Sequence, residues 1–482
     1  MMLLSSATPS NDQHRPQHHP QPHHHNNDEM SANAYESISL LSNSNSSSLR
    51  VGIAGAGAVA FGMASILSKN GHRCLLWSPS GKGTADLLQR DEDNNNNDIN
   101  DRTITSTGAL HHKFVPAIAS SAQQLVRESD VLIVALPANG HKQVFDALAP
   151  HLVSSTSASS TSNSAKHIIV SSHASFGALY LSQILHKLNS HRHHQHTITS
   201  WGTTVCTARR TSGRIVDIKT IRKSVDTCCF CDPDPHEDGS SSSTSSQDIC
   251  KRLFPDTEFR PREGLLAITL SNLNPQNHLA IALGNIGRMD NGEEWYQFKN
   301  ITPRIGSFLE ALDRERLEIA SVLGLDVKTV YDHFSLSFHV PVPKSKTGDS
   351  LSEMCGAIYE KGNDVHGPTT AIDSRYVTED VPFGLAPVVA LGKLVGRPAV
   401  LHESGLNIWN AMYGRDFSAE NDLLEAIGLL DGNGSDANDN DYGADRIGLD
   451  ELKEAARTGR LRSRLVSKKE RTESSRVVLE SS

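Results

Sequence analysis

The chain has 482 residues, of which 37% are hydrophobic, and its formal net charge is -9. This length allows two domains that each bury a core. The negative charge argues against nucleic acid as the main partner, because phosphate binding needs a concentrated positive surface. Seven cysteines are too sparse for a disulfide framework, and no apolar run suits a membrane span or a signal peptide. We therefore expect a cytoplasmic protein, a monomer or homodimer, whose partners are small molecules.

Polar low-complexity segments divide the chain. Residues 1–48 are rich in His, Pro, Gln, Asn and Ser, a composition that cannot offset its ordering entropy and predicts disorder. Its histidines could bind a metal, but the composition favours a low-complexity expansion, and we predict no metal site. Residues 461–482 are expected to form a charged, disordered tail. Four further polar tracts are expected to be surface-loop insertions, at 91–101, 154–164, 191–196 and 233–247.

Strand and helix patterns alternate between these tracts. Strands are predicted at 49–54, 73–77, 129–136 and 167–171, and helices at 61–68 and 141–152. The segment 129–136 contains the apolar run VLIVAL, which is typical of a strand buried on both faces of a parallel sheet. The alternation predicts an α/β domain with a doubly wound parallel sheet at 49–262. The later segments are longer and helical, so we predict a mostly α-helical domain at 263–460.

A glycine-rich loop follows the first predicted strand. Its sequence, GAGAVA, starts at Gly55 and opens a helix, as in the dinucleotide-binding loop of a Rossmann-type sheet. Gly55 permits the tight turn, Gly57 lets the backbone approach a pyrophosphate, and Ala60 allows close packing of the helix on the sheet. The helix N-terminus adds unpaired N–H groups for the phosphates. The loop predicts NAD or NADP as cofactor, and a purely structural glycine turn is the alternative.

The ends of two strands bear on the cofactor site. NAD sites usually carry Asp or Glu about 20 residues after the loop, bound to the ribose 2′-OH. Ser78 occupies that place, so a 2′-phosphate meets no negative charge there, and Lys82 could pair with it. We therefore expect a preference for NADP. Pro137 follows the strand at 129–136, and ligands bind at the carboxyl ends of such strands. It is expected to line the nicotinamide site, with an ordinary strand-end turn as the alternative.

The segment NPQNH offers a proton-transfer group in the second domain. Asn274 is a good N-cap and Pro275 suits the first helical position, so His278 falls near the first turn of a helix. The positive end of a helix disfavours imidazolium, and a neutral imidazole is a good general base. The alternative is a buried histidine satisfied by structural hydrogen bonds.

Two blocks of the second domain resemble the opine dehydrogenase family, the NAD(P)-dependent octopine and nopaline dehydrogenases. The first has an Asn-Pro-x-x-His start at Asn274, an Asn-x-x-Arg step, and a Thr-Pro followed by Leu-Asp-x-Glu-Arg. The second is SRYVTEDVPFGL, at residues 374–385. The resemblance extends from about residue 50 to residue 459. It implies an oxidoreductase that reductively condenses an amino acid with a 2-keto acid.

The same resemblance implies three roles. His278 matches the catalytic histidine, Asp380 matches its carboxylate partner, and Arg375 matches the arginine that binds a substrate carboxylate. Without the resemblance, Asp380 would be interpreted as a solvated loop acid and Arg375 as part of a surface ion pair. The segment 199–210 departs from the family's version, which lines the cleft, so neither substrate is identified.

Two other functions stay open. A related two-domain reductase, of the ketopantoate reductase or glycerol-3-phosphate dehydrogenase type, relies on a lysine at the start of its second domain, where this chain has the Asn-Pro-x-x-His motif. A non-catalytic nucleotide-binding sensor need not keep a proton donor. Loss of turnover without loss of cofactor affinity on replacing His278 would distinguish an enzyme from a sensor.

Overall fold

A computed structural model describes most of the chain after residue 47. The described residues are 48–88, 102–154, 166–171, 176–188, 196–230, 245–346, 348–362, 364–371, 374–430 and 447–461. Apart from a few flanking residues, the predicted N-terminal segment, the four polar insertions and the tail lie outside this part. Residues 245–247 of the last insertion are described, and they supply the N-cap and first turn of helix α6 (Ser246–Leu253).

A large sheet forms the centre of the first domain. Eight strands of the described residues pair in the order β12-β11-β8-β7-β6-β1-β2-β5. They are β1 (Arg50–Ala54), β2 (Arg73–Trp77), β5 (Ala117–Ile118), β6 (Val131–Val134), β7 (His167–Val170), β8 (Thr197–Trp201), β11 (Ser224–Phe230) and β12 (Glu258–Pro261). The neighbouring strands run parallel except β11 and β8, which are antiparallel. The sheet confirms the predicted doubly wound architecture, and the four predicted strands are β1, β2, β6 and β7.

Helices accompany the large sheet. Those described in this region are α1 (Ala58–Lys69), α2 (Ala85–Leu88), α3 (Ala122–Glu128), α4 (His141–Ser154), α5 (Gly177–Leu188) and α6, with short helices η1 (Lys82–Thr84) and η3 (Ala138–Gly140). α1 and α4 contain the two helices predicted from sequence. Residues of α3, α4 and α5 share one apolar cluster with β6 and β7.

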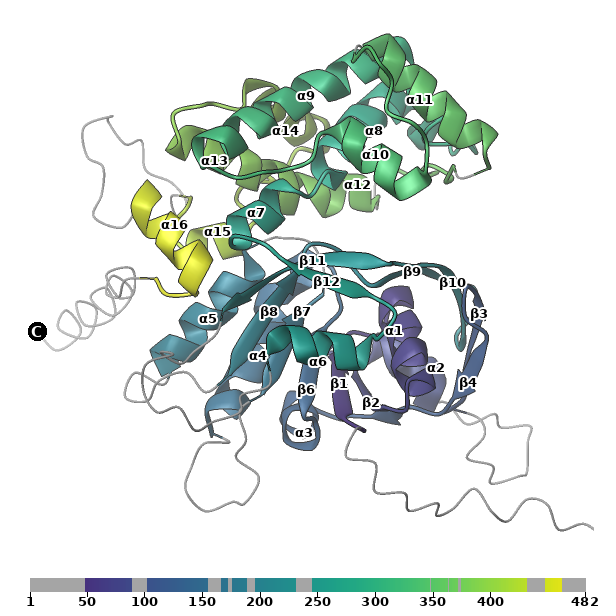
Figure 1. Ribbon diagram of the computed structural model, residues 1–482, viewed down its shortest axis with the longest axis vertical. Coiled ribbons are helices and arrows are strands. Elements are labelled where there is room, and N and C mark those ends of the chain that lie inside the picture. The colour runs from purple at the N-terminus through teal and green to yellow at the C-terminus, as the bar shows by residue number, and fades with distance from the viewer. Residues whose placement is uncertain are drawn as a thin grey trace, which may run out of the picture. The chain divides into compact units, whose positions relative to one another are not determined.

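A second, smaller sheet was not predicted. Its order is β4 (His112–Phe114), β3 (Ile104–Gly108), β10 (Ile215–Ile221) and β9 (Cys206–Arg210). α1 packs between the two sheets, since its apolar residues share one buried cluster with residues of β1, β2, β9 and β10, and Figure 1 shows it beside β9 and β10. The approach is close at Gly62, where a Cβ atom would lie 3.0 Å from the sulfur of Cys206.

The rest of the described chain is helical. It contains α7 (Leu265–Leu270), α8 (Asn274–Asp290), α9 (Pro303–Val322), α10 (Val330–Phe338), α11 (Gly348–Glu360), α12 (Arg375–Thr378), the π-helix η4 (Val381–Leu385), α13 (Ala386–Leu394), α14 (Val400–Tyr413), α15 (Asp422–Ala426) and α16 (Leu449–Thr458). Helices α8 to α14 gather in one region in Figure 1. This confirms the predicted fold class, an α/β sheet followed by a mostly helical domain. The proposed domain boundary at 262 falls between β12 and α7.

The last helix returns to the first domain. α16 packs against α7, and the carbonyl of Gly459 accepts a 2.8 Å hydrogen bond from the hydroxyl of Ser182 in α5. No helix in the described part of the chain is long and apolar enough to cross a membrane.

Candidate functional site

The glycine loop between β1 and α1 has the geometry of a phosphate site. Gly55 has a φ of +133°, and a Cβ there would lie 2.2 Å from the carbonyl oxygen of Ala135, so only glycine fits. Gly57 is the exposed N-cap of α1 and makes no side-chain cap, and a Cβ added there would meet nothing within 4 Å. Ala60 is fully buried behind it. The open approach and the uncapped N–H groups of α1 fit a dinucleotide pyrophosphate.

The turn after β2 carries the two residues expected to influence cofactor choice. The hydroxyl of Ser78 accepts a 3.1 Å hydrogen bond from the N–H of Gly83, which fixes the turn. Lys82 lies in this turn at the start of η1, with an exposed side chain and no ion pair among the residues that the structure describes. The turn therefore presents a cation and no carboxylate where the adenosine ribose is expected.

Arg210, at the end of β9, holds the loop and this turn together. Its guanidinium donates to the carbonyls of Ala56 at 3.3 Å and Gly83 at 3.2 Å. It also pairs with Asp86 at 2.7 Å and lies over the ring of Phe61. Sequence reasoning missed this role, since the contacts join segments more than a hundred residues apart.

His278 and Asp380 form a hydrogen bond in the helical domain. Nδ1 of His278, on α8, donates to Oδ2 of Asp380 at 2.7 Å, and the two side chains are 14% and 9% exposed. With Nδ1–H held by the carboxylate, a neutral ring has its lone pair on Nε2. The ring of Tyr376 stacks on His278, with centroids 3.6 Å apart and an interplanar angle of 8°. The hydrogen bond to Asp380 therefore fixes the imidazole within its plane, and the stacked ring of Tyr376 covers one of its faces.

Tyr376 is itself anchored. Its hydroxyl donates to Oε1 of Gln297 at 2.5 Å, and its N–H donates to the side chain of Ser374, which caps α12. Burial raises the pKa of the phenol, and the charge of Asp380 adds to this effect. The tyrosine therefore stays protonated and serves to orient His278. No periodic pattern in the sequence singles it out, although it lies in the block that carries Asp380.

The start of α8 differs from the prediction in one respect. Asn274 was expected to be the N-cap, but it is the first residue of the helix, and Leu273 is the N-cap. The N–H of Asn274 donates to the side-chain oxygen of Asn272 at 3.1 Å. The cause is local: Leu273 already has α-helical backbone angles, so the helix begins earlier and Pro275 falls one position later than expected.

Arg375 lies five residues before Asp380, but its side chain is paired with another acid, Glu379. Its Nε donates to Oε2 of Glu379 at 2.5 Å, and the two side chains are 66% and 4% exposed. The other oxygen of Glu379 accepts from the N–H of Ala138 at 3.3 Å. Pro137 is the N-cap of η3, which Ala138 begins. Glu379, which was not predicted, therefore links Arg375 to the turn after β6.

Two arginines influence the pKa of Tyr376. The charges of Arg209 and Arg375 both oppose the rise in the pKa of Tyr376 that burial and Asp380 produce. Arg209 is exposed and adjoins Arg210 on β9, so the two side chains point to opposite faces of the small sheet. Positive charge from both domains therefore reaches the ring that stacks on His278.

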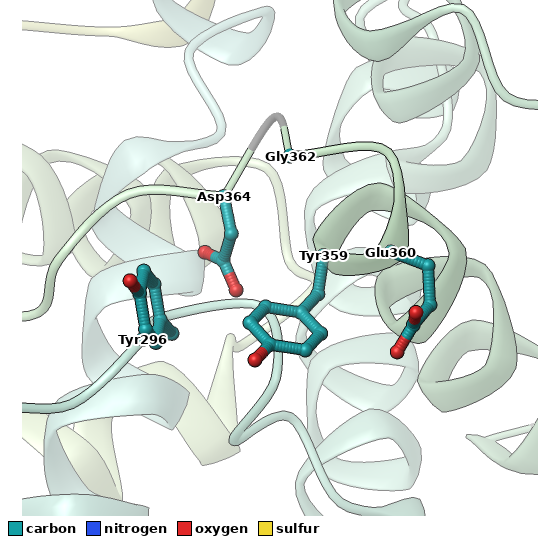
Figure 2. A pocket seen from close by; sticks show the side chains of 5 residues that line it. All are labelled: Tyr296, Tyr359, Glu360, Gly362 and Asp364. Carbon is teal, nitrogen blue, oxygen red and sulfur yellow. The ribbon is translucent and has the colours of Figure 1, made fainter. Parts of the chain in front are cut away.

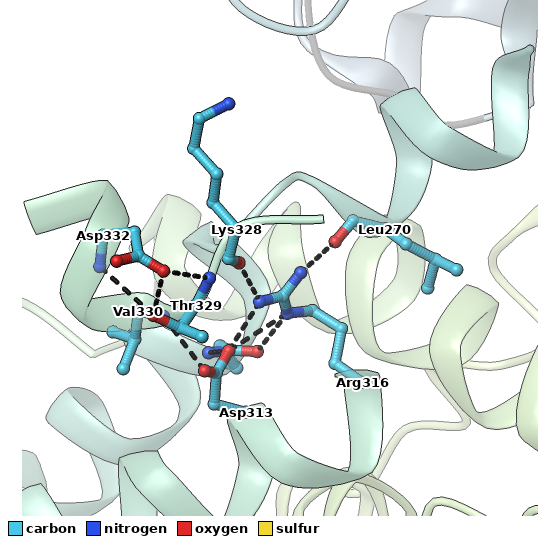
Figure 3. Close-up of polar contacts among 8 residues, drawn as sticks. Leu270, Asp313, Arg316, Lys328, Thr329, Val330 and Asp332 are labelled. Carbon is cyan, nitrogen blue, oxygen red and sulfur yellow. Dashed lines mark hydrogen bonds and ion pairs between the residues drawn. The ribbon is translucent and has the colours of Figure 1, made fainter. Parts of the chain in front are cut away.

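A buried polar network holds the start of α8. Arg316, in α9, donates to Gln276 at 3.2 Å, to Asp313 at 2.6 Å, and to the carbonyl of Lys328 at 2.6 Å. It also donates to the carbonyl of Leu270, at the end of α7. Figure 3 shows these contacts converging on its guanidinium. Arg316 thereby connects helices α7, α8 and α9 with the loop before α10. Its partner on α8, Gln276, lies two residues before His278.

A hollow of about 330 Å³ lies elsewhere in the helical domain, lined by Tyr296, Tyr359, Glu360, Gly362 and Asp364 (Figure 2). None of the predicted site residues lines it. The carboxylate of Asp364 already accepts the N–H groups of Phe298 and Lys299 at 2.9 and 2.8 Å. These hydrogen bonds of Asp364 thus serve the neighbouring backbone.

The structure brings the predicted residues together in two groups. The first group lies at the start of α1 and in the turn after β2, and it consists of Gly55, Gly57, Ala60, Ser78 and Lys82. His278, Asp380 and Arg375 lie on α8 and around α12, and Glu379 connects this second group to the turn at Pro137. Ser78 is bonded to Gly83 in the same turn as Lys82, so it contacts no residue of the second group by this hydrogen bond. Among the described residues no cluster of His, Cys, Asp and Glu has the arrangement of a metal site.

Comparisons with known proteins bear on this arrangement. Residues 261–413 match a family model described as the alpha-helical domain of NAD/NADP octopine/nopaline dehydrogenase. Residues 50–174 match one described as coenzyme F420-dependent NADP oxidoreductase. The opine dehydrogenase of Arthrobacter sp. (strain 1C) is 26% identical over 309 residues, which cover 63% of this chain and 76% of that protein.

Two solved structures share the fold. An octopine dehydrogenase in complex with NADH and L-arginine has a TM-score of 0.57 and 17% identity, covering 76% of this chain and 90% of that chain. A yersinopine dehydrogenase with NADP+ bound has a TM-score of 0.58 and 16% identity, covering 79% of this chain and 98% of that chain. The helical-domain match and the Arthrobacter relative confirm the resemblance that the motifs suggested: the chain is similar to the NAD(P)-dependent dehydrogenases of the opine dehydrogenase family.

Proposed function

We propose that the protein reductively condenses the amino group of an amino acid with a 2-keto acid, and also catalyses the reverse reaction, acting on a CH–NH bond. The observation that carries this proposal is the 2.7 Å hydrogen bond between His278 and Asp380, with Tyr376 stacked on the imidazole. Such a pair is suited to moving a proton in both directions, because the carboxylate orients the ring and stabilises its protonated form.

The reaction balances as amino acid, 2-keto acid, NAD(P)H and a proton giving opine, water and NAD(P)+. Attack of the amine nitrogen on the ketone carbon and loss of water give an imine. The reduced cofactor, when bound, supplies the hydride that adds to the imine carbon. Nε2 of His278 accepts the proton released by the amine and returns a proton during dehydration or reduction. In the reverse direction it removes the proton from the opine nitrogen.

The charges around the pair support dicarboxylic chemistry. Both substrates carry a carboxylate, and an opine therefore carries two. Arg375 is proposed to bind one of them by its planar guanidinium. The charge of Arg209, on β9, opposes the rise in the pKa of Tyr376, and we propose that this arginine attracts the other carboxylate. A site for a neutral substrate would gain nothing from two arginines placed in this way.

The first domain supports the cofactor assignment. Gly57 leaves open space beside the uncapped start of α1, where the pyrophosphate would bind. Lys82 is exposed beside Ser78, and the turn lacks the acid that would repel a 2′-phosphate. We therefore propose that NADP is preferred over NAD. Titrating the protein with NADPH and NADH tests this, and tighter binding of NADH would contradict it.

The test of the reaction is oxidation of NADPH and of NADH with a 2-keto acid, an amino acid panel, or both together. Turnover that requires both substrates is expected. Turnover with a keto acid alone would instead indicate a simple reductase. Replacing His278 by Ala should lower turnover by about 10²-fold or more while cofactor affinity persists, and unchanged turnover would remove the role given to His278.

A further inference from the structure

Glu379 is paired with Arg375 and is followed by Asp380 in the chain. Both neighbours have proposed roles, but Glu379 has none. It directly precedes Asp380 and is 3% exposed. One carboxylate oxygen accepts the N–H of Ala138 at 3.3 Å, across 241 residues of sequence. The other accepts the guanidinium of Arg375 at 2.5 Å. Each oxygen therefore serves a different structural element.

A buried carboxylate is costly unless it is hydrogen-bonded and paired with a cation. Glu379 meets both conditions only while the two partners stay where they are. Ala138 is the first residue of η3, which leads into α4. The N–H groups at such an N-terminus have no helical acceptor and favour an anion. Glu379 thus supplies, from the helical domain, the acceptor that the turn after β6 lacks.

The pairing also fixes Arg375. Its side chain is 66% exposed, and an exposed arginine ordinarily samples many rotamers. One oxygen of Glu379 accepts a hydrogen bond from Nε and forms an ion pair with Nη2, and these two nitrogens form one edge of the planar guanidinium. Among the described residues the guanidinium has no other partner, so the edge formed by Nη1 and the second N–H of Nη2 can make a two-point contact with another carboxylate.

We infer that Glu379 is a positioning residue that sets the substrate carboxylate at a fixed place relative to the carboxyl end of β6. It does so by holding Arg375 with one oxygen and the Pro137–Gly140 turn with the other. The ligand class is a 2-keto or 2-amino carboxylate bound to Arg375. This inference rests on the proposed function, because only there does Arg375 bind a substrate.

Replacing Glu379 by Gln tests the inference, since the amide keeps the size and can still accept from Ala138 but no longer carries charge toward Arg375. The KM of one carboxylate substrate should rise about tenfold, corresponding to about 1.4 kcal/mol. The Kd of NADPH, measured by fluorescence without substrate, should stay within about twofold. Glu420→Gln is the matched control, because it removes another arginine pair, with Arg415, in the same domain, and it should leave both values unchanged.

A double-mutant cycle separates positioning from general structural support. If Glu379 acts through Arg375, adding Glu379→Gln to Arg375→Ala should change kcat/KM by less than about twofold, because coupled residues are not additive. Additive effects, an unchanged KM or a lowered KM in Glu379→Gln would overturn the inference. Should the Gln variant fail to fold, Glu379→Asp repeats the test, since its shorter side chain cannot reach both partners.

Failure of the proposed function looks different. If the unaltered protein shows no turnover that requires both substrates, the reaction assignment fails before any variant is measured. If that turnover is present and the Glu379 variants bind the carboxylate substrate as tightly as the unaltered protein, only the positioning role of Glu379 is lost.

Discussion

Replacing Arg316 by Met should destabilise the helical domain strongly. Arg316 is 1% exposed and Asp313 is 4% exposed, and their ion pair spans 2.6 Å. Methionine fills much of the same space but offers no donor. Asp313 would then keep only the N–H of Val330 at 2.9 Å and the amide of Gln276 at 3.0 Å, and the carbonyls of Leu270 and Lys328 would lose their donor.

The expected cost follows from this geometry. Removing one partner of a buried ion pair costs about 3–5 kcal/mol, because the remaining charge is left uncompensated. Each carbonyl left without a donor adds to this, so the upper part of the range is expected. For a cooperative unit of about 200 residues, about 4 kcal/mol lowers the Tm by roughly 8–16 °C.

Circular dichroism melts of three variants test the reasoning. Arg415→Met removes an exposed pair with Glu420, whose side chains are 44% and 33% exposed, and should cost at most about 1 kcal/mol. Asp313→Leu combined with Arg316→Met should be less destabilised than Arg316→Met alone, because no unpaired charge remains buried. A loss below about 1 kcal/mol in Arg316→Met would refute the account of this network.

Four further predictions concern the site and the pH range of stability. Asp380→Asn should lower turnover by about 10²-fold or more without weakening cofactor binding, and turnover within about threefold would show that His278 needs no charged partner. Lys82→Ala should weaken NADPH binding about tenfold but NADH binding little, and equal losses in the two titrations would contradict its pairing with a 2′-phosphate. Arg209→Ala should raise the KM of one carboxylate substrate more than it lowers kcat, and unchanged steady-state kinetics would exclude its role. Burial, reinforced by neighbouring cationic side chains, lowers the pKa of His333 to about 4, below the ordinary value of about 6.5. The folded state therefore binds a proton at His333 less readily than the unfolded state, so the contribution of His333 to the free energy of unfolding is complete above about pH 6.5 and is lost as the pH falls toward 4. In denaturant titrations, the free energy of unfolding of His333→Gln should decline less over this pH window than that of the unaltered protein. An identical decline in both proteins would contradict the prediction.

The large sheet could be predicted because its information is local. Residues 131–136 are continuously apolar, as a strand buried on both faces requires, and the structure has β6 at Val131–Val134. The small sheet has no such signal. In β3, buried Ile104 and Ser106 alternate with the half-exposed Thr105 and Thr107, and the parallel partner β10 lies about a hundred residues later. Pairing at that distance is decided by tertiary packing on α1, which local pattern does not encode.

Some residues of the candidate site could be predicted from local sequence, and others could not. His278 could be singled out because the Asn-Pro-x-x-His segment and the second block carry a family resemblance, and whether it has the catalytic role is for the proposed experiments to decide. Glu379 and Arg210 could not be singled out, because an acid and an arginine in such places are usually solvated. Their contacts with Ala138 and with Ala56 exist only after the chain has folded.

The placement of α1 between two sheets has a consequence for ligand affinity. A helix that is packed on one side can still rock or fray at its first turn, and a phosphate must then restrict that motion when it binds. Here Gly62 lets β9 approach closely, and Arg210 fastens the loop before α1 from the side opposite to the large sheet. The N–H groups of the first turn are thus preorganised, and their freedom is lost during folding rather than on binding. A larger side chain at Gly62 would consequently appear as a binding defect far from any group that contacts the ligand.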